Sequence, residues 1–212
     1  MKKNKLQNRI GITLIETLMA VAIFSIGIGG FSLLFIKTWQ SNAYTIELGQ
    51  SSMAVSQGMN MMVDYIRRVR QGDDGAYPIQ LASNNELTIF CDYNKDTITE
   101  RLHFYKNGTD VMMGITSPSA TMPKTYPVGD QSVITIASRI VNNSSTPIFY
   151  YYNKDYPQDT INNPLAGSVN IPVVRLVKIY LEINLNPAHA PDNVKMQNFV
   201  EMRNLNDYDH LK

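Results

Sequence analysis

The feature that most constrains this chain is a long apolar run near its N-terminus, from Ile12 to Ile36. Its only polar side chains are Thr13, Glu16, Thr17, Ser25 and Ser32. A helix rises about 1.5 Å per residue, so a helical run of this length would cover about 37 Å. That length is enough to cross a hydrocarbon core about 30 Å thick. We therefore expect residues 12–36 to form a transmembrane helix.

One carboxylate, Glu16, lies about one turn into this expected helix. An ionisable group at membrane depth costs roughly 2.5–3.5 kcal/mol on insertion scales, and so marks a functional position by default. The alternative is a plain signal anchor in which Glu16 reaches the cytoplasmic interface.

Charge is distributed unevenly along the chain. The first eleven residues contain four basic side chains and no acid: Lys2, Lys3, Lys5 and Arg9. By the positive-inside bias, we expect the N-terminus to lie in the cytoplasm and everything after Ile36 to lie outside the cytoplasmic (inner) membrane. The rest of the chain has 19 − 4 = 15 basic and 18 acidic residues, a formal charge of −3. It therefore carries no strong nucleic-acid signal.

Gly11 lies at the border between the basic segment and the apolar run. A secretory signal peptide normally has a shorter apolar region followed by a small-residue cleavage site, and no such site follows Ile36. A cut at Gly11 would instead keep the helix on the mature protein. Residues 1–11 are thus expected to be a basic leader peptide.

The basic leader, Gly11 and the sequence Ile12-Thr13-Leu14-Ile15-Glu16 resemble the N-terminal signature of type IV pilins and type II secretion pseudopilins. The resemblance implies that a prepilin peptidase cuts between Gly11 and Ile12 and methylates the new amine of Ile12. It implies that Glu16 docks the subunit into a filament by pairing with a neighbour's N-terminal ammonium. Implied partners are other pilin or pseudopilin subunits, the peptidase, an inner-membrane assembly platform and membrane lipid. Ile12 departs from the usual Phe of the family.

Three glycines interrupt the apolar run at Gly27, Gly29 and Gly30. Each costs about 1 kcal/mol relative to Ala inside a helix. They are candidates for a stretch that extends or melts within a filament. Close packing of neighbouring helices through small residues is an equally good explanation.

Residues 37–71 are predicted to continue the helix as an amphipathic segment. Leu48, Val55, Met62 and Val69 recur every seven residues, with Met59 and Ile66 between them. This stripe predicts one buried face, covered by a sheet rather than by a coiled-coil partner. The methionines at 59, 61 and 62 are expected to fill the core. The arginines at 67, 68 and 70 are expected to suit the helix dipole rather than to bind DNA. The whole helix would span roughly 59 residues, or roughly 88 Å.

After Pro78 the pattern alternates as in strands. Strands are expected at 86–93, 97–106 and 109–115, which form a meander, and at 133–141, 148–152, 173–184 and 196–205. Residues 72–212 are thus predicted to be an extracytoplasmic β-sheet domain. The fold class is α+β, with a long N-terminal helix packed on an antiparallel sheet. The strand order, ending in Met202-Arg203-Asn204-Leu205, also resembles minor pilins and J-type minor pseudopilins.

Other motifs give little support for chemistry. Asp92, Asn94 and Asp96 are spaced as in a calcium loop, but Thr97 and His103 stand where an EF-hand needs Gly and Glu. A hairpin turn is favoured there, and a looser calcium site is the alternative. Cys91 is expected in the core. No cofactor motif or catalytic constellation is present, so an enzyme is not predicted.

The sequence therefore predicts a minor pilin or pseudopilin subunit that joins or initiates a thin filament for pili, type II-like secretion or DNA uptake. Two alternatives stay open. One is a membrane-anchored extracytoplasmic binding domain that does not polymerise, and the other is an anchored enzyme.

Overall fold

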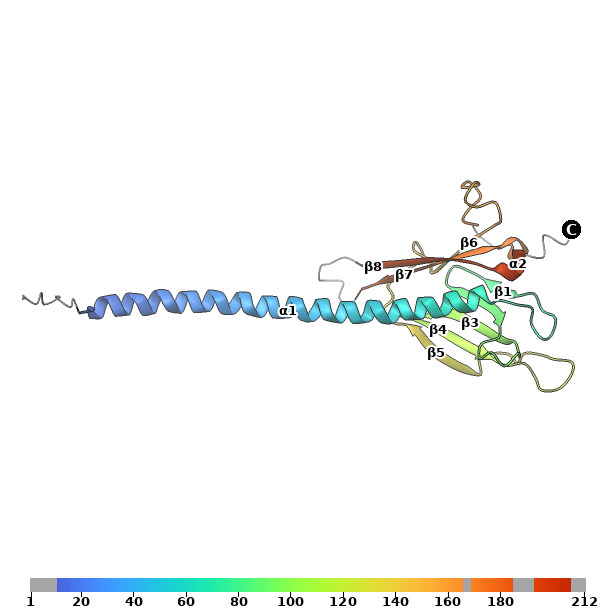
Figure 1. Ribbon diagram of the computed structural model, residues 1–212, viewed down its shortest axis with the longest axis horizontal. Helices are drawn as coiled ribbons and strands as arrows, with labels where there is room; N and C mark the ends of the chain where they lie inside the picture. The colour runs from blue at the N-terminus through green and yellow to red at the C-terminus, as the bar shows by residue number, and fades with distance from the viewer. Residues whose placement is uncertain (1–10, 166–168, 185–192, 207–212) are drawn as a thin grey trace, which may run out of the picture. The chain divides into compact units, whose positions relative to one another are not determined.

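The computed structural model describes residues 11–165, 169–184 and 193–206. One long N-terminal helix packs against antiparallel sheets, which confirms the predicted α+β class (Figure 1). The helix α1 runs from Leu14–Arg67. The strands are β1 (Ile79–Ala82), β2 (Glu86–Cys91), β3 (Glu100–Asn107), β4 (Asp110–Thr116), β5 (Ser132–Ala137), β6 (Phe149–Tyr152), β7 (Leu176–Ile183) and β8 (Val194–Glu201). A 3-10 turn, η1 (Ile171–Val173), precedes β7, and a short helix, α2 (Arg203–Asn206), follows β8.

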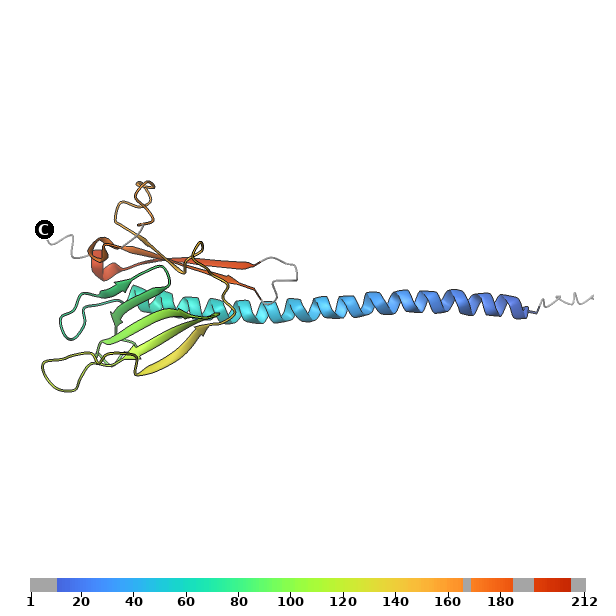
Figure 2. The same cartoon turned by 180° about the vertical axis from the view of Figure 1, so that it is seen from behind.

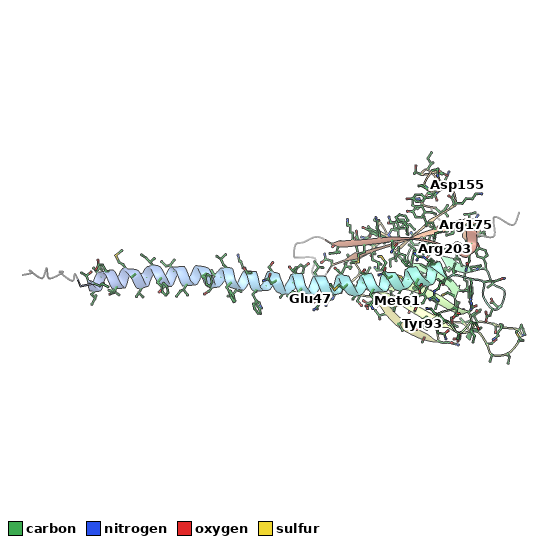
Figure 3. All side chains as sticks on the ribbon, in the orientation of Figure 1. Glu47, Met61, Tyr93, Asp155, Arg175 and Arg203 are labelled. Atoms are coloured by element: carbon green, nitrogen blue, oxygen red, sulfur yellow. The ribbon has the colours of Figure 1, made fainter. Side chains whose placement is uncertain are left out.

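The chain divides into two compact units, the first ending at Glu47 and the second beginning at Leu48. In the first unit, apolar side chains lie exposed on all sides of α1 (Figure 3). An all-round apolar helix needs an apolar environment, either a protein interior or a membrane. Among the described residues, α1 is the one helix long and apolar enough to cross a membrane.

In the second unit, α1 buries one face only. Val55, Met59, Met62 and Ile66 are buried, as the heptad stripe predicts. Met61 is 40% exposed, so its prediction as core filler is wrong. Met61 is one position away from Met62, and a helix turns about 100° per residue, which carries it off the buried face.

The helix ends earlier than predicted, at Arg67, and has 54 residues rather than roughly 59. Its last turn tightens, because the Arg68 amide reaches the Tyr65 carbonyl at 3.1 Å. The Arg70 amide then donates to the Phe90 carbonyl at 2.9 Å, so the chain is already bound beside β2.

Two sheets, not one, accompany the helix. The five-stranded sheet has the sequential order β1-β2-β3-β4-β5, and the three-stranded sheet has the order β6-β7-β8. The predicted meander is confirmed as β2-β3-β4, to which β5 and the unpredicted β1 are added. In Figures 1 and 2 the three-stranded sheet lies above the Leu48–Arg67 part of α1, and the strands β3, β4 and β5 of the five-stranded sheet lie below it.

The core faces of both sheets follow from their register. Leu87, Phe104 and Met113 are cross-strand partners in β2, β3 and β4, and all are buried. In β7, Val177, Ile179, Leu181 and Ile183 are all buried, as their alternation predicts.

At Gly58 the helix α1 lies very close to the five-stranded sheet. A Cβ atom at Gly58 would collide with the backbone carbonyl of Ile136 at the end of β5. Glycine is therefore required at this position by packing, since the helical backbone itself does not need it.

The last predicted strand is partly wrong. The strand β8 ends at Glu201, and the chain turns into α2 instead of continuing to Leu205. The side chains of Met202 and Leu205 are both buried. Burying two residues three positions apart suits a helical turn, whereas a strand places them on opposite faces.

Candidate functional site

The start of α1 is organised by a pair of side chains. The Glu16 carboxylate accepts hydrogen bonds from both the amide and the hydroxyl of Thr13, each at 2.8 Å. The Glu16 amide donates to the Thr13 hydroxyl at 3.4 Å. This reciprocal arrangement is a capping box, which satisfies backbone groups that a helix start leaves open.

Glu16 thus has a local partner within the single chain, a role that the sequence analysis missed. The signal was present, because Thr13 and Glu16 have the Thr-x-x-Glu spacing that marks a helix start. This capping role of Glu16 is compatible with its predicted role as a contact to a neighbouring subunit. A carboxylate has about four lone-pair sites, so bonding to Thr13 leaves acceptor capacity for another partner.

The predicted cleavage site lies just before this capping box. Gly11 and Ile12 are exposed and precede the first residue of α1, Leu14. Exposed backbone near a chain terminus and outside a helix is a preferred place for proteolytic cleavage. Gly27, Gly29 and Gly30 lie inside the helix, and a Cβ atom on any of them would meet no other part of the chain within 4 Å.

The possible calcium loop between β2 and β3 is held together by its own hydrogen bonds. The two carboxylate oxygens of Asp92 accept from the amides of Asp96 and Thr97, each at 3.1 Å. The carboxylate of Asp96 accepts from the Ile98 amide at 2.8 Å. Residues 11–165, 169–184 and 193–206 contain no group of three or more His, Cys, Asp or Glu side chains placed to hold a metal. The favoured hairpin is confirmed, because β2 and β3 pair antiparallel on either side of this loop. The alternative, a looser calcium site with Asp92, Asn94 and Asp96, stays untested.

The arginines at the end of α1 bind this same loop. Arg68 donates to the Asp92 carbonyl at 2.9 Å, and Arg70 donates to the Thr97 carbonyl at 2.7 Å. Arg70 also donates to the Thr99 hydroxyl at 2.9 Å. Arg68 and Arg70 lie beyond the end of α1, so their predicted place in its last turn is wrong, and Arg67 is the basic residue of that turn. Arg68 and Arg70 instead fasten the chain just after the helix to the loop.

Two buried titratable groups lie next to this loop. Cys91 is fully buried, as predicted, and burial raises the pKa of its thiol to about 11. Glu100 is 3% exposed, and burial raises the pKa of its carboxyl, although a hydrogen bond from the Tyr93 amide at 2.9 Å opposes this. A thiol with a raised pKa is a poor nucleophile at neutral pH, so Cys91 is a core residue.

Of the three histidines, His103 has a described partner. Its Nδ1 lies 3.2 Å from the Asp130 carboxylate. His189 and His210 lie outside the described residues.

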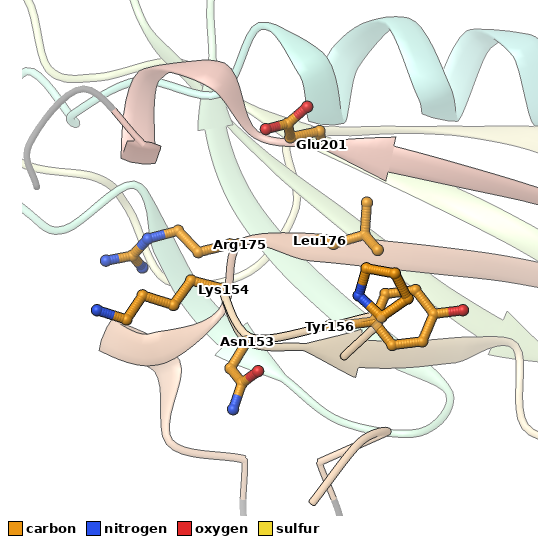
Figure 4. A pocket seen from close by; sticks show the side chains of 7 residues that line it. Asn153, Lys154, Tyr156, Arg175, Leu176 and Glu201 are labelled. Carbon is orange, nitrogen blue, oxygen red and sulfur yellow. The ribbon is translucent and has the colours of Figure 1, made fainter. Parts of the chain in front are cut away.

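A pocket on the three-stranded sheet was not predicted from the sequence. It has a volume of about 400 Å³ and is lined by Asn153, Lys154, Tyr156, Pro157, Arg175, Leu176 and Glu201 (Figure 4). Its residues come from the loop after β6, from Arg175 and Leu176 at the start of β7, and from the end of β8. The sequence contained one signal, the run of four aromatic residues that forms β6, but strand pairing was needed to bring the other residues to it.

Comparison with known proteins does not assign this chain to a family. The sequence matches no protein-family model, and no curated protein matches it significantly.

Proposed function

We propose that this chain is a minor subunit of a thin filament of the type IV pilin and pseudopilin kind. A prepilin peptidase would cut it between Gly11 and Ile12 and methylate the new amine of Ile12. The main support is the position of the sequence from Gly11 to Glu16, which lies at the start of the helix α1. One part of this helix is apolar on all sides, and another part is covered by sheets. A plain signal anchor does not require this combination of features.

Glu16 would be the assembly contact. An ammonium and a carboxylate attract strongly where the dielectric is low, while each alone is costly there. The bonds from Thr13 hold the Glu16 carboxylate at the helix start, beside the site where the new N-terminus would form. A neighbouring subunit's amine could then bind this carboxylate without displacing Thr13.

Before assembly, the subunit would be held in the cytoplasmic membrane with its N-terminus inside and its sheets outside. The apolar part of α1 supports a single membrane crossing. The basic residues ahead of it support the orientation. Filament growth would then need other subunits and an inner-membrane assembly platform.

The direct test is the mature N-terminus, measured by mass spectrometry on the full chain expressed with and without a prepilin peptidase. We expect N-methylated Ile12 only when the peptidase is present. Gly11→Leu should block the cut, and Ile12→Phe, which restores the usual family residue, should preserve it. An uncut Met1 in the presence of peptidase, or a cut after Ile36, would contradict the proposal.

A further inference from the structure

The outer face of the three-stranded sheet carries a cluster of aromatic rings, which we call the aromatic face. It consists of Tyr150, Tyr152, Tyr156, Tyr180 and Phe199. The register places Tyr150, Lys178 and Phe199 side by side on β6, β7 and β8. Because side chains alternate along a strand, this face is opposite to the buried residues Val177 and Ile179. Such a position is normally polar, so the rings need an explanation.

The rings contact one another and extend to the pocket. The ring centroid of Tyr156 lies 4.4 Å from that of Tyr152, and Tyr156 stacks on Phe199 with an interplanar angle of 14°. The Lys178 ammonium lies 4.7 Å from the ring centroid of Tyr150 and 5.4 Å from that of Tyr180. Tyr156 also lines the pocket, so the aromatic face and the pocket form one continuous surface.

The loop that carries Lys154 and Tyr156 is held in place by two hydrogen bonds between Asn153 and Asn163. The Asn153 amide donates to the Asn163 side-chain oxygen at 3.0 Å, and the Asn163 side-chain nitrogen donates to the Asn153 side-chain oxygen at 2.9 Å. Asn163 is 7% exposed and also donates to the Asp159 carbonyl. Tying both ends of the loop lowers the conformational entropy that a ligand would otherwise have to remove.

The pocket combines an apolar side with charges of both signs. In the view of Figure 4, Lys154 and Arg175 extend in the same direction, Tyr156 lies by Leu176, and Glu201 lies across from them. Its volume of about 400 Å³ is at the small end of ligand sites, which span roughly 300–1,000 Å³.

We propose that this pocket and the aromatic face bind an oligosaccharide. A pyranose ring has an apolar C–H face that packs on an aromatic ring, and hydroxyls on its rim that both donate and accept hydrogen bonds. Tyr156 matches the ring face, Glu201 matches hydroxyl donors, and Lys154 matches hydroxyl or carboxylate acceptors. A nucleic acid would stack on the same rings, but the chain after residue 11 carries a formal charge of −3, which opposes the binding of a phosphate backbone. This inference does not depend on the proposed filament function.

The test uses the full chain in detergent micelles and three hexasaccharides, built from glucose, N-acetylglucosamine and galacturonic acid. Binding is followed by saturation-transfer NMR and calorimetry, with a single-stranded oligothymidylate as the competing ligand class. We expect at least one hexasaccharide to bind and the oligothymidylate not to bind. Binding of the galacturonic acid chain alone would identify an acidic saccharide, and binding of the others a neutral one.

Variants then locate the site. Tyr156→Ala should weaken binding about tenfold. Tyr77→Ala removes an exposed tyrosine outside the pocket and should change binding less than about twofold. Tyr156→Phe should preserve it. Glu201→Gln, an exposed position, gives a second route if Tyr156→Ala unfolds, and should weaken binding about fivefold. The proposal would be overturned if none of the three hexasaccharides binds or if the oligothymidylate binds more tightly than they do. It would also be overturned if Tyr156→Ala and Glu201→Gln both bind a hexasaccharide as tightly as the unchanged chain does.

Discussion

The two parts of α1 obey different rules although they form one continuous helix. From Leu14 to Ile36 the side chains are apolar on every side and exposed, with Glu16 the one ionisable group. From Leu48 to Arg67 a single stripe is buried under two sheets, while the other positions are polar or exposed. An all-round apolar surface needs an apolar solvent, whereas a stripe needs one protein surface. The difference teaches that the chain itself supplies the partner for only one part of its helix.

The largest expected effect is in the first part. Replacement by Glu16→Ala should reduce the filament fraction at least about thirtyfold, because a desolvated charge pair is worth about 2–5 kcal/mol. Insertion into the membrane should be preserved, since removing the acid removes its cost. Immunoblots of the sheared-filament and membrane fractions measure both quantities.

Ser25→Ala is the matched control, because Ser25 is polar, lies in the same segment and bonds only to the Val21 carbonyl within α1 among its described contacts. It should leave the filament fraction unchanged. If Glu16→Ala formed normal filaments, Glu16 would not be an assembly contact.

In the second part, the stripe is tested by two methionines. Met62 is fully buried, so Met62→Ala should lower the free energy of unfolding by about 2–5 kcal/mol. Met53 is 75% exposed, so Met53→Ala should change it by less than about 0.5 kcal/mol. Urea unfolding of the full chain in micelles, followed by circular dichroism, gives both values. Equal effects would show that the stripe does not carry the packing.

Two glycines in the same part separate helix propensity from packing. Both alanine variants gain about 1 kcal/mol of helix propensity. A Cβ atom at Gly49 meets nothing within 4 Å, so Gly49→Ala should stabilise the protein. A Cβ atom at Gly58 would meet the Ile136 backbone, so Gly58→Ala should destabilise it by about 1–3 kcal/mol. The same unfolding measurement decides, and a stabilising Gly58→Ala would disprove the close approach.

The smallest effect concerns the buried acid near the end of the helix. Burial raises the pKa of Glu100 above its ordinary 4.5, so the folded state holds the proton more tightly than the unfolded state. The resulting stability is complete below the unfolded pKa and is lost as the pH rises through the folded pKa. Glu100→Gln should therefore gain stability relative to the unchanged chain as pH rises from about 4 toward 7.

Unfolding curves at a series of pH values measure this difference. Glu86→Gln removes an exposed carboxyl from the neighbouring strand and controls for net charge. A Glu100→Gln difference that does not grow with pH would show that burial is not the controlling influence on this carboxyl.

The sequence predicted what local periodicity determines. The seven-residue spacing of Leu48, Val55 and Met62 predicted the buried face of the helix, and the alternation of apolar residues predicted β7. Each pattern could be recognised because it reflects one element that packs on one surface. The division into two sheets could not be predicted, because it depends on which distant strands pair. The turn into α2 was missed for a similar reason, since it is fixed by the burial of Met202 and Leu205.

The candidate sites divide in the same way. The motif from Gly11 to Glu16 is contiguous, so it was visible in the sequence, although its capping box with Thr13 was overlooked. The pocket was invisible, because Tyr156, Arg175 and Glu201 come from three separate segments. The sequence shows that Arg70 is positively charged, but it does not show that its partner is the loop that carries Thr97.

The fastening at the end of α1 has a mechanical consequence. Arg68 and Arg70 bind the β2–β3 loop, and the Asn204 side chain of α2 donates to the Val69 carbonyl at 2.8 Å. A pull along α1 therefore reaches two separate places in the sheet-bearing unit at once. The tension is divided among several hydrogen bonds instead of resting on the chain that leads into β1. These hydrogen bonds thus reduce the load that a pull on the helix would place on β1.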